Sequence, residues 1–160
     1  MCMKYINAIA TCYSSISTVD NHITSLNAPL YQLEVEDKNN PYISDFSIVT
    51  RLNFLGTSRA VNEADNILLN GESVDLIIRL TKCDKEENKR LGYDIDNFSI
   101  DLSKVDTDVA CFEFYNYMRI TNVKKISLPA GLGKYVLKVL IKKSNEKDYT
   151  IQSMSLITIK

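Results

Sequence analysis

The stretch that decides the fold is Leu128-Pro-Ala-Gly-Leu-Gly-Lys-Tyr135-Val-Leu-Lys-Val-Leu-Ile-Lys-Lys143. Its glycines favour a turn, and an alternating pattern follows that is typical of a strand with one buried face. Apolar residues at alternate positions from Tyr135 to Ile141 share that face, while Lys138 and Lys142 lie on the other. A second strand, Tyr149 to Ile159, follows the polar connection at 144–148. We therefore predict the closing hairpin of an antiparallel β protein.

The same period of two recurs along the chain. It predicts strands at 45–54, 74–81 and 112–120, and further strands at Tyr5 to Ser15, Leu30 to Glu36 and Phe98 to Leu102. Asn70-Gly71 is typical of a two-residue hairpin turn, because both central residues of such a turn need a positive φ. In these strands we expect inward-facing sets at Phe46, Ile48, Leu52 and Phe54, at Val74, Leu76, Ile78 and Leu80, and at Phe112, Phe114, Met118 and Ile120.

These strands predict an all-β, mainly antiparallel fold, a β-sandwich of roughly eight strands. One segment departs from the pattern: Thr57 to Asn66 has capping residues and helical spacing, so we expect at most one short helix there. No linker or repeat divides the chain, and residues 1–160 are expected to form a single domain.

A resemblance to a known superfold comes from the closing hairpin. Gly133-Lys134-Tyr135-x-Leu137-x-Val139 resembles the penultimate strand of an immunoglobulin-like sandwich. In that superfold a tyrosine near the strand start bonds the preceding corner through its hydroxyl, which is the role the resemblance implies for Tyr135. The motif covers a small part of the chain, without the paired cysteines and core tryptophan of true immunoglobulin domains, and a superfold implies no function.

Charge and composition set aside several classes of protein. The formal net charge is −1, from 19 basic and 20 acidic residues, so no broad positive field is expected for nucleic acid. No apolar run is long enough for a transmembrane segment, and the N-terminal residues are too polar for a secretion signal. The four cysteines are scattered, and we expect them to be reduced and buried. A cytoplasmic location is the prediction.

No catalytic constellation is visible in the sequence. Gly131-Leu-Gly-Lys134 invites comparison with a phosphate-binding loop, but Leu128 and Tyr135 occupy positions where that motif needs Gly and Ser or Thr, so a turn is predicted. His22 is the only histidine, and no nucleophile elbow accompanies it, which favours a loop or turn residue. We predict neither an enzyme nor a cofactor.

Acidic residues are densest between Asp94 and Asp108, and Asp94, Asp96 and Asp101 are weak candidates for a calcium site. The EF-hand pattern fails, because Ser99 stands where it requires glycine and Val105 where it requires glutamate. Solvated loops and strand ends are the favoured interpretation of these carboxylates.

The candidate partner-binding residues are Tyr115, Tyr117 and Arg119. If Met118 and Ile120 fill the core, these three lie together on the outer face of their strand. Tyrosine and arginine are enriched at binding hot spots, so this face is the predicted contact surface. Packing against a neighbouring strand is the alternative explanation for the two tyrosines.

The predicted function is a non-enzymatic protein-interaction or assembly module, which binds a protein partner or self-associates through an edge strand or the tyrosine face. One alternative is a calcium- or lipid-responsive sandwich similar to C2 domains, using the acidic residues named above. A second is a carbohydrate-binding module, which the lack of tryptophan weakens although tyrosines can stack on sugars.

Overall fold

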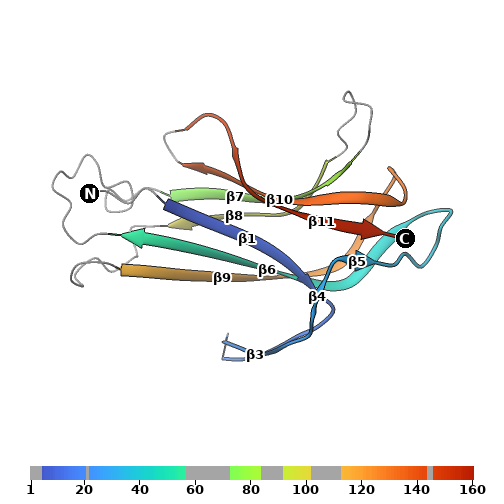
Figure 1. Cartoon of the computed structure of the whole chain (residues 1–160), viewed down its shortest axis with the longest axis horizontal. Coiled ribbons are helices and arrows are strands. Elements are labelled where there is room, and N and C mark those ends of the chain that lie inside the picture. Colours follow the sequence, from blue (N-terminus) through green and yellow to red (C-terminus); the bar gives the residue numbers. More distant parts are fainter. Residues whose placement is uncertain (1–4, 21, 57–72, 84–91, 102–112, 144–145) are drawn as a thin grey trace.

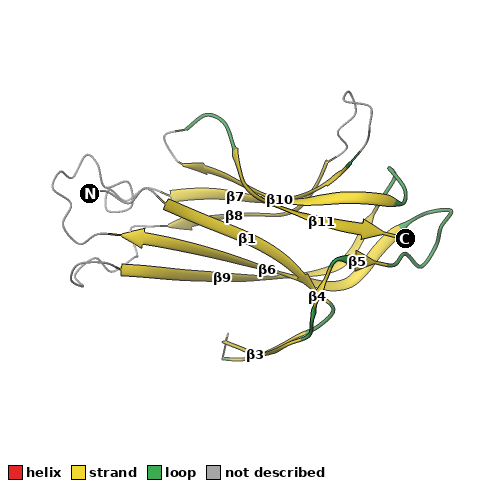
Figure 2. Cartoon of the chain, viewed as in Figure 1, coloured by secondary structure: helices red, strands yellow, loops and turns green. Residues whose placement is uncertain are grey.

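The structure, a computed structural model, describes residues 5–20, 22–56, 73–83, 92–101, 113–143 and 146–160. Every regular element in these ranges is a β-strand (Figure 2), so the predicted all-β class is confirmed. The predicted short helix at 57–66, the Asn70-Gly71 turn and Phe112 lie outside the described residues.

The strands follow one another with these bounds: β1 (Tyr5–Tyr13), β2 (Ile16–Val19), β3 (His22–Leu26), β4 (Pro29–Leu30), β5 (Gln32–Leu33), β6 (Tyr42–Gly56), β7 (Ser73–Lys82), β8 (Gly92–Asp101), β9 (Glu113–Ser127), β10 (Gly133–Lys143) and β11 (Thr150–Ile159).

Two sheets pack face to face as a β-sandwich (Figure 1). The four-stranded sheet has the order β4-β1-β6-β9, and the five-stranded sheet has the order β5-β11-β10-β7-β8. Neighbouring strands are antiparallel except β5 and β11, which run parallel. The short hairpin of β2 and β3 forms a sheet of its own and projects away from the outer side of the four-stranded sheet.

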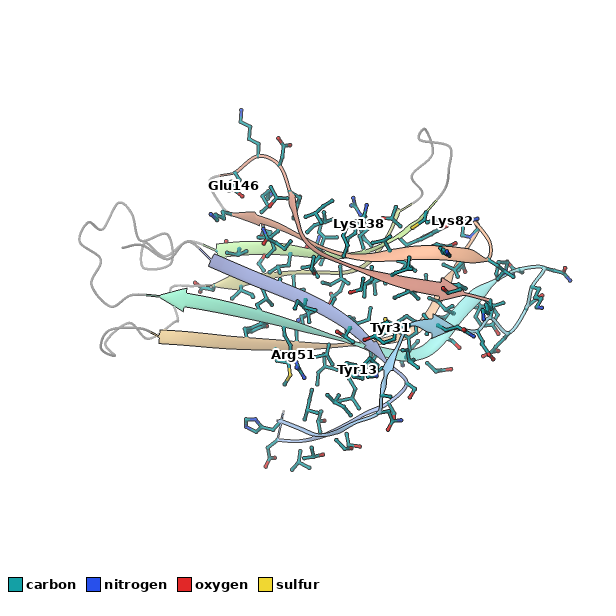
Figure 3. The ribbon with its side chains drawn as sticks, viewed as in Figure 1. Tyr13, Tyr31, Arg51, Lys82, Lys138 and Glu146 are labelled. Atoms are coloured by element: carbon teal, nitrogen blue, oxygen red, sulfur yellow. The ribbon has the colours of Figure 1, made fainter. Side chains whose placement is uncertain are left out.

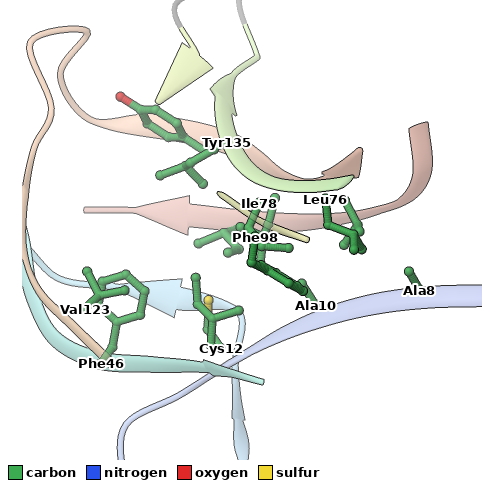
Figure 4. Packing of buried hydrophobic residues seen from close by; sticks show 14 of the residues in the cluster. Ala8, Ala10, Cys12, Phe46, Leu76, Ile78, Phe98, Val123 and Tyr135 are labelled. Carbon is green, nitrogen blue, oxygen red and sulfur yellow. The ribbon is translucent and has the colours of Figure 1, made fainter. Parts of the chain in front are cut away.

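The core lies between the two sheets and follows the predicted alternation (Figure 4). Alternate residues of β6, β7 and β10 face inward, and the buried positions include Phe46, Ile48, Leu52, Val74, Leu76, Ile78, Leu80, Leu137, Val139 and Ile141. Lys138 projects from the opposite face of β10, as expected (Figure 3). Burial of these side chains, each contributing roughly 1.5–3 kcal/mol, holds the sheets together.

Tyr135 closes the corner that precedes β10. Its side chain is fully buried, and its hydroxyl donates a hydrogen bond of 2.6 Å to the carbonyl of Gly131. Gly131 and Gly133 have φ of 77° and 134°, which glycine adopts most readily, and the Gly131 N–H bonds Leu128 O at 2.8 Å. The predictions of a turn and of a tyrosine that bonds its own corner are both confirmed.

The N-terminal third differs most from expectation. In place of one strand from Leu30 to Glu36, the chain forms the two-residue strands β4 and β5, which join different sheets. The hairpin of β2 and β3 was not predicted, and it makes His22 the exposed first residue of a strand, beside the turn. Asp20 takes a φ of 49° in that turn.

Two cysteines lie in the described ranges, and both are free thiols. Cys12 is in the core, where burial raises the pKa of its thiol to about 12. Cys83 is exposed, so the expectation that all four cysteines are buried is wrong for this one. The described residues contain no helix that could cross a membrane.

Candidate functional site

Tyr117 and Arg119 lie on the face of β9 opposite to the one predicted. They pair with Leu52 and Thr50 of β6, both of which face inward, whereas Met118 is half-buried on the outer face. The predicted face of β9 was therefore wrong. The cause is that β9 carries apolar and amphipathic residues on both faces, so alternation alone does not select the inner one. Tyr115 also lies on β9, but its side chain is outside the described part.

Arg119 bridges the two sheets. Its Nε and Nη2 donate to the carboxylate of Asp96 on β8 at 2.8 and 3.2 Å, and its guanidinium carbon lies 4.3 Å from the ring centroid of Phe98. The Thr121 hydroxyl donates to the same carboxylate at 2.6 Å. Burial opposes ionisation of Asp96, but the hydrogen bonds from Arg119 and Thr121 outweigh it, so the pKa of Asp96 is lowered.

The acidic candidates on β8 point in different directions. An irregularity in β8 pairs Asp96 with the inward-facing Ile78 but Asp94 with the outward-facing Arg79. Arg79 holds Asp94 through contacts of 2.5 and 3.1 Å, and this hydrogen bond raises the pKa of Arg79. Asp101 lies at the far end of the same strand. Within the described ranges, no three His, Cys, Asp or Glu side chains gather closely enough to hold a metal ion.

The ion pair of Asp96 and Arg119 closes one side of the sandwich. β8 and β9 are the edge strands of their sheets on that side, and the Asp96 to Arg119 bridge joins them. Both strands also carry further charged residues, a device that protects sheet edges from pairing with other chains.

The opposite side has an open edge on β11. β10 pairs with one side of β11 along its length, while β5 covers the other side only at Thr158 and Ile159. There the N–H of Thr158 bonds Tyr31 O at 2.9 Å. Since N–H groups alternate in direction along a strand, those of Met154 and Leu156 point to the same open edge. No described strand pairs with residues 150–157 on that side.

The side chains of this edge are unusual for an exposed strand. Residues 150–159 include no charged residue, and Ile151, Met154 and Leu156 are 49%, 63% and 53% exposed. Met154 and Leu156 pair with Lys138 and Val136 of β10, which places them on the outer face of the five-stranded sheet. An uncharged edge with exposed apolar side chains is the type that pairs readily with another strand. We call residues 150–157 of β11 the open edge.

β1 lies across the sandwich from β11 and shares these features. β4 pairs with β1 only at Cys12 and Tyr13, so within the described residues β6 is the one strand hydrogen-bonded to the rest of β1. The strand contains no charged residue, and Ile9 on its outer face is exposed. Both sheets therefore end, on this side, in strands without charge.

A second surface feature is a groove of about 610 Å³ beneath the β2 and β3 hairpin. Ile16 and Thr18 line it from the hairpin, and Met118, Ile120 and Asn122 line it from the outer face of β9. Figure 3 shows Tyr13 and Arg51 on this same side of the molecule. Tyr117 and Arg119 of β9 also border the groove, which offers a contact surface of mixed apolar and polar residues.

The open edge is not among the site residues predicted by number. The signal was present in the sequence as two strands without charge, Tyr5 to Tyr13 and Tyr149 to Ile159, in a chain where roughly a quarter of residues are charged.

A comparison with models of known protein families finds no match, and neither does a search of curated proteins.

Proposed function

We propose that the chain is a non-enzymatic protein-interaction or assembly module that binds an extended strand along the open edge of β11. The proposal is carried by three features of residues 150–157 together: no described strand pairs with their outer side, they have no charge, and Ile151, Met154 and Leu156 are exposed. Strand addition of this kind uses main-chain hydrogen bonds for affinity and alternate side chains for specificity.

The contrast between the two sides of the sandwich supports this choice of surface. On the β8 and β9 side, charges and the Arg119 bridge oppose the approach of another strand. The Arg119 guanidinium is already engaged by Asp96 and stacked on Phe98, which leaves it less suited to a partner than an open backbone edge. The open edge therefore replaces the tyrosine face as the proposed contact surface.

An immunoglobulin-like identity and a cytoplasmic location are parts of the same proposal. Strands β1, β6 and β9 opposite β11, β10 and β7 follow the order of strands A, B and E opposite G, F and C of that superfold, and Tyr135 makes the matching corner bond. In such sandwiches β11 corresponds to the last strand, an edge. The free thiols of Cys12 and Cys83 favour a reducing compartment.

The test is affinity purification from the native host with two matched variants. Leu156→Lys places a charge on the open edge, and Val19→Lys places one at a residue of similar exposure, 59%, on the β2 and β3 hairpin. We expect the Leu156→Lys variant to lose the bound partner, whether another protein or further copies of the chain, because a lysine at an edge opposes strand pairing. The Val19→Lys variant is expected to retain it.

The comparison is made on variants that melt cooperatively within a few degrees of the wild type. A folded Leu156→Lys variant that retains every partner of the wild type contradicts the proposal. So does loss of the same partners from the Val19→Lys variant, because the contact surface then lies elsewhere.

A further inference from the structure

We infer that the strand bound at the open edge is β11 of a second copy of this chain, paired antiparallel and centred on Ser155. This inference rests on the proposed function, and it names the partner, the orientation and the register. The resulting dimer has one continuous sheet, in which the five-stranded sheets of the two copies join through β11.

The two ends of the regular, uncovered part of the open edge determine the register, because the two-fold axis is expected at its midpoint. At one end, the pairing of β10 with β11 shifts between Val139 and Leu140, which leaves Gln152 as an extra residue. At the other end, β5 occupies the edge from Thr158 onward. The regular, uncovered segment is therefore Ser153 to Ile157, and its midpoint is Ser155.

Antiparallel pairing about Ser155 uses both outward-facing amides. Met154 of each copy lies opposite Leu156 of the other, and these residues exchange main-chain hydrogen bonds because their N–H and C=O groups point to the edge. Their side chains then form an apolar cluster of four on the outer face, covering the two most exposed apolar residues of β11. The two Ser155 residues face each other at the axis, where small side chains avoid steric conflict.

Charge favours a second copy in this orientation. In a two-fold dimer, each residue near the axis lies close to the same residue of the second copy. A charged residue there would therefore be repelled by its counterpart. β11 has no charge from Thr150 to Ile159, and the nearest charge at each end, exposed Asp148 and exposed Lys160, has the opposite sign to the other. Antiparallel pairing brings Asp148 of one copy to the same end as Lys160 of the other, whereas parallel pairing would place like charges together.

Cysteine trapping tests the register. In a background with Cys2, Cys83 and Cys111 replaced by serine, Ser155→Cys and Ser153→Cys are compared under mild oxidation. Residues at the axis have Cα atoms about 4.5 Å apart, which permits a disulfide. Ser153 of one copy lies opposite Ile157 of the other, four residues away from that copy's Ser153. The two Ser153 residues are therefore about 13 Å apart along the strand, too far for a disulfide. We expect Ser155→Cys to form a covalent dimer and Ser153→Cys to remain a monomer.

Three outcomes overturn the inference: no covalent dimer with Ser155→Cys, equal trapping with both variants, or trapping of Ser155→Cys that persists after Leu156→Lys is added. The inference can also fail while the proposed function stands. In that case the purified chain stays monomeric and untrapped, yet affinity purification shows a different protein that the Leu156→Lys variant loses. If Leu156→Lys changes neither trapping nor partner binding, both proposals fail.

Discussion

The Tyr135 hydroxyl ties the turn before β10 to the core. It is buried and donates to Gly131 O at 2.6 Å. Removing it with Tyr135→Phe leaves a carbonyl without this donor, so we expect the free energy of unfolding to fall by about 1–3 kcal/mol without a change of fold. Urea denaturation measures the loss, with Tyr31→Phe, at an exposed tyrosine, as the control. An unchanged stability of Tyr135→Phe contradicts this role.

Thr50 presents the opposite case, a buried hydroxyl without a hydrogen-bond partner in the described structure. The atom is its Oγ1, and the residue is fully buried on β6. Thr50→Val keeps the shape and removes the polar atom, so we expect an increase in the free energy of unfolding of about 1 kcal/mol. Thermal melting of the two proteins checks the sign. A lower melting temperature for Thr50→Val would show that the hydroxyl is satisfied in solution.

Asp96 makes stability depend on pH. Its pKa is lower in the folded chain than in the unfolded chain, because the hydrogen bonds from Arg119 and Thr121 outweigh the effect of burial. The ionised Asp96 therefore makes its full contribution to the free energy of unfolding above the unfolded pKa of about 3.9. That contribution is lost as the pH falls through the lower pKa of the folded chain. We expect Asp96→Asn to be less stable than wild type at neutral pH and to lose less stability on acidification.

The measurement for Asp96 is urea denaturation at a series of pH values from neutral to about 2, which extends well below the unfolded pKa of an aspartate. Glu34→Gln, at an exposed glutamate outside the strands, is the control for loss of a surface carboxylate and should follow the wild-type curve. Parallel curves for Asp96→Asn and wild type would mean that the bridge to Arg119 has no influence on the pH dependence.

Among the elements, the turn before β10 is the one most constrained by its sequence. Gly131 has a φ of 77° and open space around the position of an added Cβ, so a substitution there strains only the backbone. We expect Gly131→Ala to lower the free energy of unfolding by about 1–2 kcal/mol. Gly131→Asn should lose less, because asparagine tolerates the left-handed region. Equal stability of wild type and Gly131→Ala, measured in urea, contradicts this.

The same elements show what the sequence can predict. β7, β10 and the central part of β6 have a clear period of two, so their buried faces were predicted correctly, although β6 and β7 extend beyond the predicted ranges. β9 has half-buried residues on both faces, and its inner face is set by Asp96, which lies 23 residues earlier on another strand. That contact depends on which strands are opposite each other, which local alternation does not encode. The β2 and β3 hairpin had a local signal, the turn-forming pair Asp20-Asn21 after Ile16 to Val19, but its strands are short.

At the scale of the molecule, the two sides of the sandwich have different chemistry. The edge strands β8 and β9 are charged and joined by an ion pair, whereas β1 and β11 on the other side contain no charge. The pattern of strands and the sandwich class were predictable from alternation and turns. The open edge was not, because the order of strands in each sheet determines which strands lie outermost, and that order comes from packing of the whole chain.

Sedimentation velocity over a range of protein concentrations tests the central claim most directly, that the open edge of β11 is where copies of the chain assemble. We expect the wild type and the Val19→Lys variant to shift from the 18.2 kDa monomer to a dimer as concentration rises. Leu156→Lys should remain monomeric while folded. A wild type that stays monomeric throughout, or a Leu156→Lys variant that dimerises as the wild type does, would contradict the claim.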